Sequence, residues 1–201
     1  MPPEPPDAPL VLLDACCVIN LLASGVAEEV LVTVPARFAV ARIVVEDEVL
    51  FVGAVEDDAP EGNQAVPGAR ESAEPEPGRV DPAPFIEQGR LEVMEPTTDE
   101  AHETFVELAL QLDDGEAMTG ILAIHRSAEV ATDDRKAIRV LQGRSPPVPL
   151  RRTSSLLRTW VRRANVPQER VREVLRRIQR RASFSPPVDD PEREWWRKMV
   201  K

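Results

Sequence analysis

The sequence contains little of what several common kinds of active site require. Its only two cysteines, Cys16 and Cys17, are adjacent, so they are poorly placed to join loops by disulfide bonds or to form a CxxC pair. A reducing environment is therefore expected. Its only two histidines, His102 and His125, lack a local partner and are expected to be ordinary helix residues. A Gly-rich phosphate loop of the Walker type is also missing. Disulfide scaffolds, histidine-based zinc sites and nucleotide hydrolysis are therefore not expected.

Long hydrophobic runs are absent as well. The N-terminal segment MPPEPPDAP has neither the basic start nor the apolar stretch of a signal peptide. No apolar run approaches the ~20 residues that span a bilayer. We therefore expect a soluble, cytoplasmic protein with no membrane partner, in which residues 1–8 form a flexible N-terminus.

The charge is distributed unevenly along the chain. The formal net charge is −10, yet residues 151–182 contain eleven Arg and two Glu, which is a local charge of +9. An acidic body with one basic helical segment fits a metal site combined with a phosphate-binding surface. The same segment also fits an Arg-rich helix face that is merely solvated, and the sequence leaves both interpretations open.

Short apolar runs alternate with amphipathic segments along the chain. Strands are expected at residues 9–13, 38–40, 129–132 and 148–150 and at the end of segment 84–93, and helices at 15–22, 26–34, 43–52, 97–112, 113–126 and 133–141. Alternation of this kind predicts a three-layer α/β fold, in which a parallel sheet of about four or five strands has helices on both faces.

One domain with appendages is expected from the length and the apolar content. Residues 9–157 are predicted to form the α/β domain, 158–183 a basic helical extension, and 184–201 a tail that is mobile apart from its tryptophans. Residues 53–80 contain seven acidic residues, four Pro and four Gly but almost no large apolar side chain. Such a segment cannot bury enough surface to offset its ordering entropy, so a disordered acidic insertion is expected there.

Acidic residues follow the predicted strands or lie on the helices beside them. Asp14 follows the first strand, Asp133 and Asp134 follow a later one, and Glu116 and Glu48 lie on helices. In an open parallel sheet, ligands collect beyond the carboxyl ends of the strands. Carboxylates that share a pocket repel one another unless a cation neutralises them, and hard oxygen ligands suit Mg²⁺ or Mn²⁺. All five acids are therefore candidate catalytic residues, and all except Glu48 are candidate metal ligands.

These acids also have interpretations in which they only shape the backbone. Asp113 and Glu116 have the spacing of a capping box, and Asp133 or Thr132 would serve as a cap for the helix that follows. Glu48 has acidic neighbours that would face solvent equally well. Asp14 is the hardest to explain in this way, because a charge between a buried strand and an apolar helix is costly without a partner.

Four segments together resemble the successive acidic motifs of the PIN-domain family: LLDACCVINLL, VEDEVLFV, LDDGEAMTGILAIH and VATDDRKAIRVL. The resemblance covers residues 11–157 apart from the insertion. It implies a PIN-like fold and a metal-dependent nuclease of the kind found in toxin ribonucleases and RNA-processing factors. The acidic cluster that it implies consists of Asp14, Glu48, Glu116 and Asp133 or Asp134. Such a site would bind Mg²⁺ or Mn²⁺ and position a water for in-line attack on an RNA phosphodiester.

Several further residues are candidates for contacts with nucleic acid. Thr153 and Ser154 open a helix whose N-terminus would hold a phosphate, although a plain N-cap explains them equally well. The complete set of candidates is Asn20, Thr132, Thr153, Ser154, Arg158 and Arg162, the two arginines being expected to contact backbone phosphates. The sequence departs from the family at Cys16, where many members have Ser or Thr, because a thiol is a poorer hydrogen-bond partner for a metal-bound water.

The leading hypothesis is a metal-dependent endoribonuclease that acts on single-stranded or structured RNA. A PIN-like module that binds nucleic acid or protein without cleaving it is an alternative, which Cys16 and the ambiguity of Glu48 favour. A third hypothesis is the toxin of a toxin–antitoxin pair with an antitoxin as its partner, although toxins of this family are usually shorter. Trp195 and Trp196 lie in a polar tail and would dock onto the body, onto a second subunit in a homodimer, or onto another protein.

Overall fold

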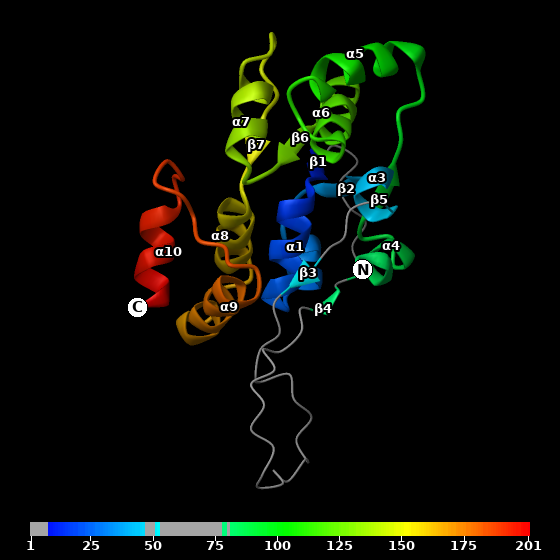
Figure 1. The fold of residues 1–201 in the computed structure, drawn as a ribbon. Helices are drawn as coiled ribbons and strands as arrows, with labels where there is room; N and C mark the ends of the chain where they lie inside the picture. The colour runs from blue at the N-terminus through cyan, green and yellow to red at the C-terminus, as the bar shows by residue number, and fades with distance from the viewer. Residues whose placement is uncertain (1–7, 47–50, 53–77, 80) are drawn as a thin grey trace, which may run out of the picture.

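The computed structural model describes residues 8–46, 51–52, 78–79 and 81–201 of the chain. At its centre is a five-stranded parallel sheet with the strand order β5-β2-β1-β6-β7 (Figure 1). The strands are β1 (Leu10–Leu13), β2 (Arg37–Ala41), β5 (Glu92–Met94), β6 (Glu129–Ala131) and β7 (Leu150–Arg151). A separate antiparallel pair is formed by β3 (Phe51–Val52) and β4 (Gly78–Arg79).

Helices lie on both faces of the parallel sheet. Figure 1 shows α5, α6 and α7 on one side of the strands and α1, α8 and α9 on the other. The helices are α1 (Ala15–Ser24), α2 (Ala27–Thr33), α3 (Arg42–Glu46), α4 (Ala83–Glu87), α5 (Asp99–Ala109), α6 (Asp114–Arg126), α7 (Arg135–Gln142), α8 (Thr153–Arg163), α9 (Gln168–Arg181) and α10 (Arg193–Val200). The expected three-layer α/β fold with a parallel sheet and C-terminal helices is therefore confirmed.

The central strand β1 shows why the apolar runs become the middle of the sheet. Val11, Leu12 and Leu13 are buried, because β1 is paired on both sides and covered by helices on both faces. The chain then enters α1, which ends at Gly25 with a φ of +72°, a conformation that glycine adopts without strain. The guanidinium of Arg177 on α9 lies within 2.9 Å of the position that a Cβ at Gly25 would take, so α9 packs against the end of α1.

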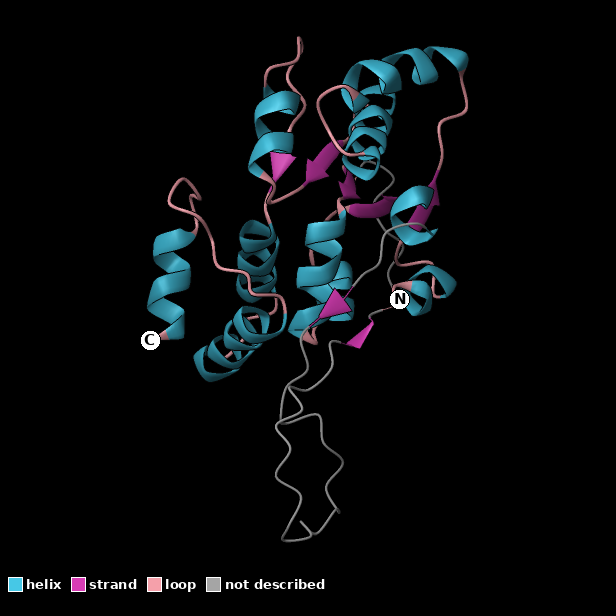
Figure 2. Ribbon diagram, viewed as in Figure 1, coloured by secondary structure: helices cyan, strands magenta, loops and turns pink. Residues whose placement is uncertain are grey.

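The helix that was expected at residues 43–52 is shorter than predicted. Helix α3 ends at Glu46, and Phe51–Val52 form strand β3, which pairs with Gly78–Arg79 (Figure 2). Phe and Val favour strands, and the pairing partner comes from a distant part of the sequence. The candidate Glu48 lies outside the described residues, as does most of the insertion predicted at 53–80.

The tail that was expected to be mobile contains a helix instead. Residues 193–200 form α10, which packs against α9. Trp196 is 1% exposed and meets the ring of Phe184 edge to face, with 5.6 Å between the ring centroids. Arg176 of α9 also donates hydrogen bonds to the carbonyl of Val200 at 2.9 and 3.1 Å. The burial of one indole anchors a segment whose composition is otherwise polar.

Within the described residues no single helix is both long and apolar enough to cross a membrane. Helices α1 and α2 meet such a criterion only when they are taken together, and they are bent by 112° relative to each other.

Candidate functional site

The polar residues that follow the central strands meet at one edge of the sheet. Asp14 follows β1, and the segment Thr132–Asp134 follows β6, which pairs with β1 in parallel. From β1 the chain crosses to β2 on one side, whereas β6 is added on the other side. The strand order therefore reverses between β1 and β6, and a switch point of this kind leaves a crevice beyond the strand ends.

A cleft of about 530 Å³ opens at this edge, and we call it the carboxylate cleft. Its lining residues are Asp14, Ala15, Cys16, Ile43, Asp113, Asp114, Gly115, Glu116 and Asp134. Five of these nine described residues carry a carboxylate and none of the nine is basic. Because like charges in one cleft repel each other, the arrangement favours a cation as the occupant.

Asp14 is held rigidly between β1 and α1. It caps α1 by accepting the Ala15 N–H at Oδ1 over 2.9 Å, and its Oδ2 accepts the hydroxyl of Thr132 over 2.7 Å. The thiol of Cys16 donates to the same Oδ2 at 3.4 Å. Burial raises the pKa of Asp14, and the hydrogen bonds from Thr132, Cys16 and Ala15 offset this only in part. Thr132 is thus one of the partners that a carboxylate in this buried position needs.

Glu116 combines a capping role with a place in the cleft. Its Oε2 accepts the N–H of Asp113 at 3.3 Å, which completes the capping box predicted from the sequence. Its Oε1 accepts no hydrogen bond from the described residues. Burial raises the pKa of Glu116 to about 6, and the negative charges of Asp134 and Asp14 contribute to the increase. The capping and metal-binding interpretations of Glu116 are therefore compatible.

Asp134, rather than Asp133, caps α7 and lines the cleft. Its Oδ1 accepts the N–H groups of Lys136 and Ala137 at 2.6 and 2.8 Å, so α7 begins at Arg135 and not at Asp133 as expected. Its Oδ2 accepts no hydrogen bond within the described part of the chain. Both Glu116 and Asp134 thus present one carboxylate oxygen that the backbone does not use.

Asp133 is placed differently and does not line the carboxylate cleft. Its Oδ2 accepts hydrogen bonds from Asn20 Nδ2 at 3.0 Å and from the Thr153 hydroxyl at 2.5 Å. The thiol of Cys17 donates to the same oxygen over a longer distance of 3.6 Å. Burial raises the pKa of Asp133, and the hydrogen bonds from Thr153 and Asn20 lower it in part. Asp133 therefore belongs to an internal polar network beside the cleft.

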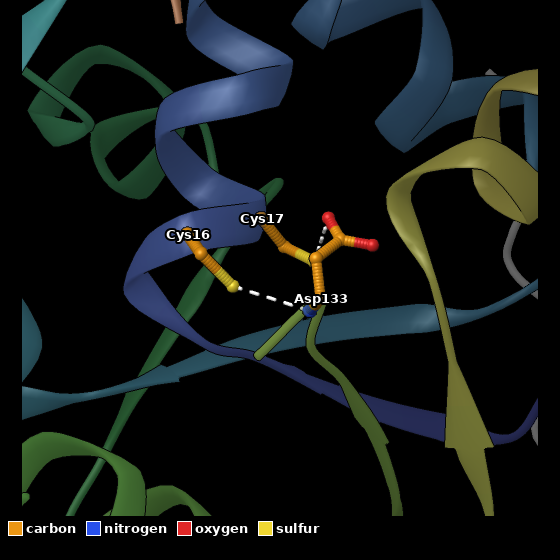
Figure 3. Close-up of side chains that lie close together, drawn as sticks. All are labelled: Cys16, Cys17 and Asp133. Atoms are coloured by element: carbon orange, nitrogen blue, oxygen red, sulfur yellow. Dashed lines mark hydrogen bonds between the residues drawn. The ribbon is translucent and has the colours of Figure 1, made fainter. Parts of the chain in front are cut away.

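A second group of potential metal ligands lies at this network, and we call it the thiol cluster: Cys16, Cys17 and Asp133 (Figure 3). The two Sγ atoms and a carboxylate oxygen all lie within 4.8 Å of one another. The structure therefore brings together a group that is able to hold a metal ion. This cluster was not predicted from the sequence, because the two cysteines precede Asp133 by more than 100 residues and only the pairing of β1 with β6 brings them together.

The six candidates for nucleic-acid contact are not among the described residues that line the carboxylate cleft. Thr132, Asn20 and Thr153 are buried and hydrogen-bonded to the acids described above. The Ser154 hydroxyl donates to Asp190 at 2.9 and 2.8 Å, and the Arg158 guanidinium pairs with Glu192. Arg162 is exposed on α8. A role for these residues in phosphate binding remains a prediction.

The cleft also contains acids that were not proposed as ligands from the sequence. Asp113 and Asp114 line it beside Glu116. Their signal was present in the LDDGEAM segment, but Asp113 was interpreted there only as part of a cap.

Comparison with known proteins adds no relative: no family model, no curated protein and no solved structure matches the chain.

Proposed function

We propose that the protein is a metal-dependent ribonuclease in which Asp14, Glu116 and Asp134 bind Mg²⁺ or Mn²⁺. The observation that carries this proposal is the convergence of these three carboxylates on one cleft that has no basic residue among its described lining. They come from three different elements: the end of β1, the first turn of α6 and the N-cap of α7. Such an arrangement concentrates negative charge at the switch point of the sheet, where α/β proteins bind ligands.

The donor set fits a hard divalent cation. All the proposed ligand atoms are carboxylate oxygens, which are the hard donors that Mg²⁺ and Mn²⁺ prefer, and waters and substrate phosphates would complete the coordination. The cleft volume of about 530 Å³ leaves room for such waters and for a phosphodiester. Burial raises the pKa values of Asp14 and Glu116, and a bound cation would favour their charged forms.

Each carboxylate is fixed before any ligand arrives. Asp14 is oriented by Thr132, and Glu116 and Asp134 each use one oxygen for a helix cap. Fixed ligands of this kind lose little conformational freedom on binding. The free oxygens, Glu116 Oε1 and Asp134 Oδ2, are the atoms that would contact the cation or one of its waters.

A bound divalent cation would lower the pKa of a water and neutralise charge on the phosphodiester. The chain itself would hold the ion and orient the reactants. Glu116 Oε1 is the oxygen available to the ion or to one of its waters, because Oε2 is engaged by the Asp113 N–H.

The substrate would be held by basic residues outside the acidic lining. Arg135 and Lys136 follow Asp134 directly and are exposed, as are Arg162 and Arg163 on α8. Contacts from such residues to phosphates provide affinity without sequence preference. A cytoplasmic location is part of the proposal, since both cysteines are free and a reducing compartment keeps them so.

The test is cleavage of a labelled single-stranded RNA with Mn²⁺, Mg²⁺ or EDTA, comparing wild type with Asp14→Asn. Asparagine retains the size of aspartate and its ability to cap α1, so the variant is expected to fold. The matched control is Glu103→Gln, which changes an exposed acid on α5. We expect metal-dependent cleavage by wild type and by the control, and none by Asp14→Asn.

Intact RNA in every condition with folded wild-type protein would contradict the proposal. It would favour a PIN-like module that binds nucleic acid without cleaving it.

A further inference from the structure

The thiol cluster differs from the carboxylate cleft in the kind of ion that it suits. We propose that Cys16, Cys17 and Asp133 form a second metal site, for a thiophilic divalent cation such as Zn²⁺, at the wall of the cleft (Figure 3). Thiolate ligands select Zn²⁺ and similar ions, whereas carboxylates and water suit Mg²⁺ and Mn²⁺. The thiol cluster would therefore prefer soft ions and the carboxylate cleft hard ions, although the two sites are adjacent. This inference does not depend on the ribonuclease proposal.

The distances fit tetrahedral coordination. With a Zn–S bond of ~2.3 Å and a Zn–O bond of ~2.1 Å, the sulfur and the oxygen of a tetrahedral site lie about 3.6 Å apart. The Cys17 Sγ and Asp133 Oδ2 atoms are 3.6 Å apart. The Cys16 Sγ completes a group whose members all lie within 4.8 Å of one another, so small side-chain rotations would close the site.

The cluster has an open side toward the cleft. Cys16 is half-buried and lines the carboxylate cleft, whereas Cys17 is completely buried. An ion would therefore enter past Cys16. Three protein ligands would leave the fourth tetrahedral position to a water from the cleft, which is the arrangement of an open zinc site.

Burial and the negative charge of Asp133 raise the pKa of the Cys17 thiol, so its proton would leave only as an ion binds. Other contacts would stabilise the charged ligands once the ion is present. Both cysteines lie in the first turn of α1, where the positive end of the helix dipole stabilises negative charge. The backbone N–H of Asp133 donates to Cys16 Sγ at 3.3 Å. Asn20 and Thr153 donate to Asp133 Oδ2 and hold it in place, as outer hydrogen-bond partners do for metal ligands.

Binding would replace only weak interactions. The two S–H protons would leave to solvent as the sulfurs coordinate the ion, so the donor bonds from Cys17 to Asp133 and from Cys16 to Asp14 would be lost. Both are thiol hydrogen bonds of 3.4 Å or more, whereas the stronger bonds from Asn20 and Thr153 to Asp133 are compatible with coordination.

The test is a Co²⁺ titration of the fully reduced protein, read by the near-ultraviolet sulfur-to-cobalt charge-transfer band. We expect wild type to develop this band, to release protons as it does so, and to lose the band when Zn²⁺ displaces Co²⁺. Cys16→Ser should weaken Co²⁺ binding by more than about tenfold, the lower limit seen when even an outer partner of a metal ligand is removed. Glu103→Gln is the matched control, since it changes an exposed acid on α5 outside both sites, and it should leave the band unchanged.

A second measurement on the unaltered chain guards against a variant that fails to fold. Zn²⁺ should protect the half-buried Cys16 from alkylation, whereas Mg²⁺ should not. The proposal would be overturned if folded, reduced wild type showed no band or if the band survived Cys16→Ser. It would also be overturned if Zn²⁺ did not slow the alkylation of Cys16. Because these readouts are optical and chemical, a protein that cleaves no RNA would still test it.

Discussion

The substitutions Asp134→Asn and Glu116→Gln separate the capping role of these acids from a role as metal ligands. Asparagine is as good an N-cap as aspartate, and glutamine replaces glutamate in a capping box. The hydrogen bonds to the Lys136, Ala137 and Asp113 N–H groups can therefore persist in the variants. If the two acids only cap helices, both variants should keep their caps, and Mn²⁺ should change their Tm by as much as it changes that of wild type.

The metal-binding role predicts a large difference when a divalent ion is present. An ion at 100 times its Kd stabilises the folded state by about 2.7 kcal/mol. For a chain of this size, each kcal/mol shifts the Tm by roughly 2–4 °C, so Mn²⁺ should raise the wild-type Tm by about 5–11 °C. If the loss of a ligand weakens binding by about 100-fold, the same Mn²⁺ concentration stabilises the variant by only about 0.4 kcal/mol, or about 1–2 °C.

The assay is thermal unfolding followed by circular dichroism, with EDTA or with a saturating concentration of Mn²⁺. Glu169→Gln is the control, because Glu169 is an exposed acid in the first turn of α9. We expect wild type and the control to show the full Mn²⁺ increment and the two cleft variants to lose most of it. Equal increments in all four proteins would refute the assignment of Glu116 and Asp134 as ligands and leave them as caps.

Three further predictions follow from the packing and the electrostatics. The pKa of Glu116 is about 6 in the folded protein, whereas the ordinary value for glutamate is 4.5, so the folded state binds this proton more tightly. The metal-free stability should therefore fall as the pH rises between these values. Across this pH window, the free energy of unfolding measured in urea should fall less for Glu116→Gln than for wild type. An equal fall in the two proteins would show that Glu116 is not its cause. Asp133→Ala should lower the free energy of unfolding by about 2–4 kcal/mol, because Asn20 and Thr153 lose the acceptor that they share. A loss below about 1 kcal/mol, measured in urea, would argue against a stabilising role for these hydrogen bonds. Trp196→Ala should cost about 3–5 kcal/mol by the same measurement and Trp195→Ala less, whereas a mobile tail would make both changes neutral.

Local patterns in the sequence were sufficient for most of the fold. The apolar run before Asp14 has the composition of a strand buried on both faces, and β1 is buried on both faces. The acids after β1 and β6 were predicted to gather at one edge, because ligands of parallel sheets collect beyond the carboxyl ends of the strands. Asp14, Glu116 and Asp134 do meet at this edge. These inferences succeeded because strand pattern and helix capping depend on neighbouring residues.

Other features depend on which distant segments meet, and no local pattern encodes this. The segment TDD offers two adjacent acids, and the turn after β6 sends Asp134 to the cleft and Asp133 to Asn20 and Thr153. Adjacent residues leave an extended segment in opposite directions, so a shift of one position would exchange their roles.

The sequence by itself determined the α/β class, the parallel sheet and the edge at which the acids gather. Only the tertiary structure decided which of the predicted acids line the cleft, that Cys16 and Cys17 join Asp133, and that a polar tail docks through Trp196. The physical reason is that periodicity and capping act over a few residues, whereas these contacts join segments that the chain brings together only when the strands pair and the helices pack.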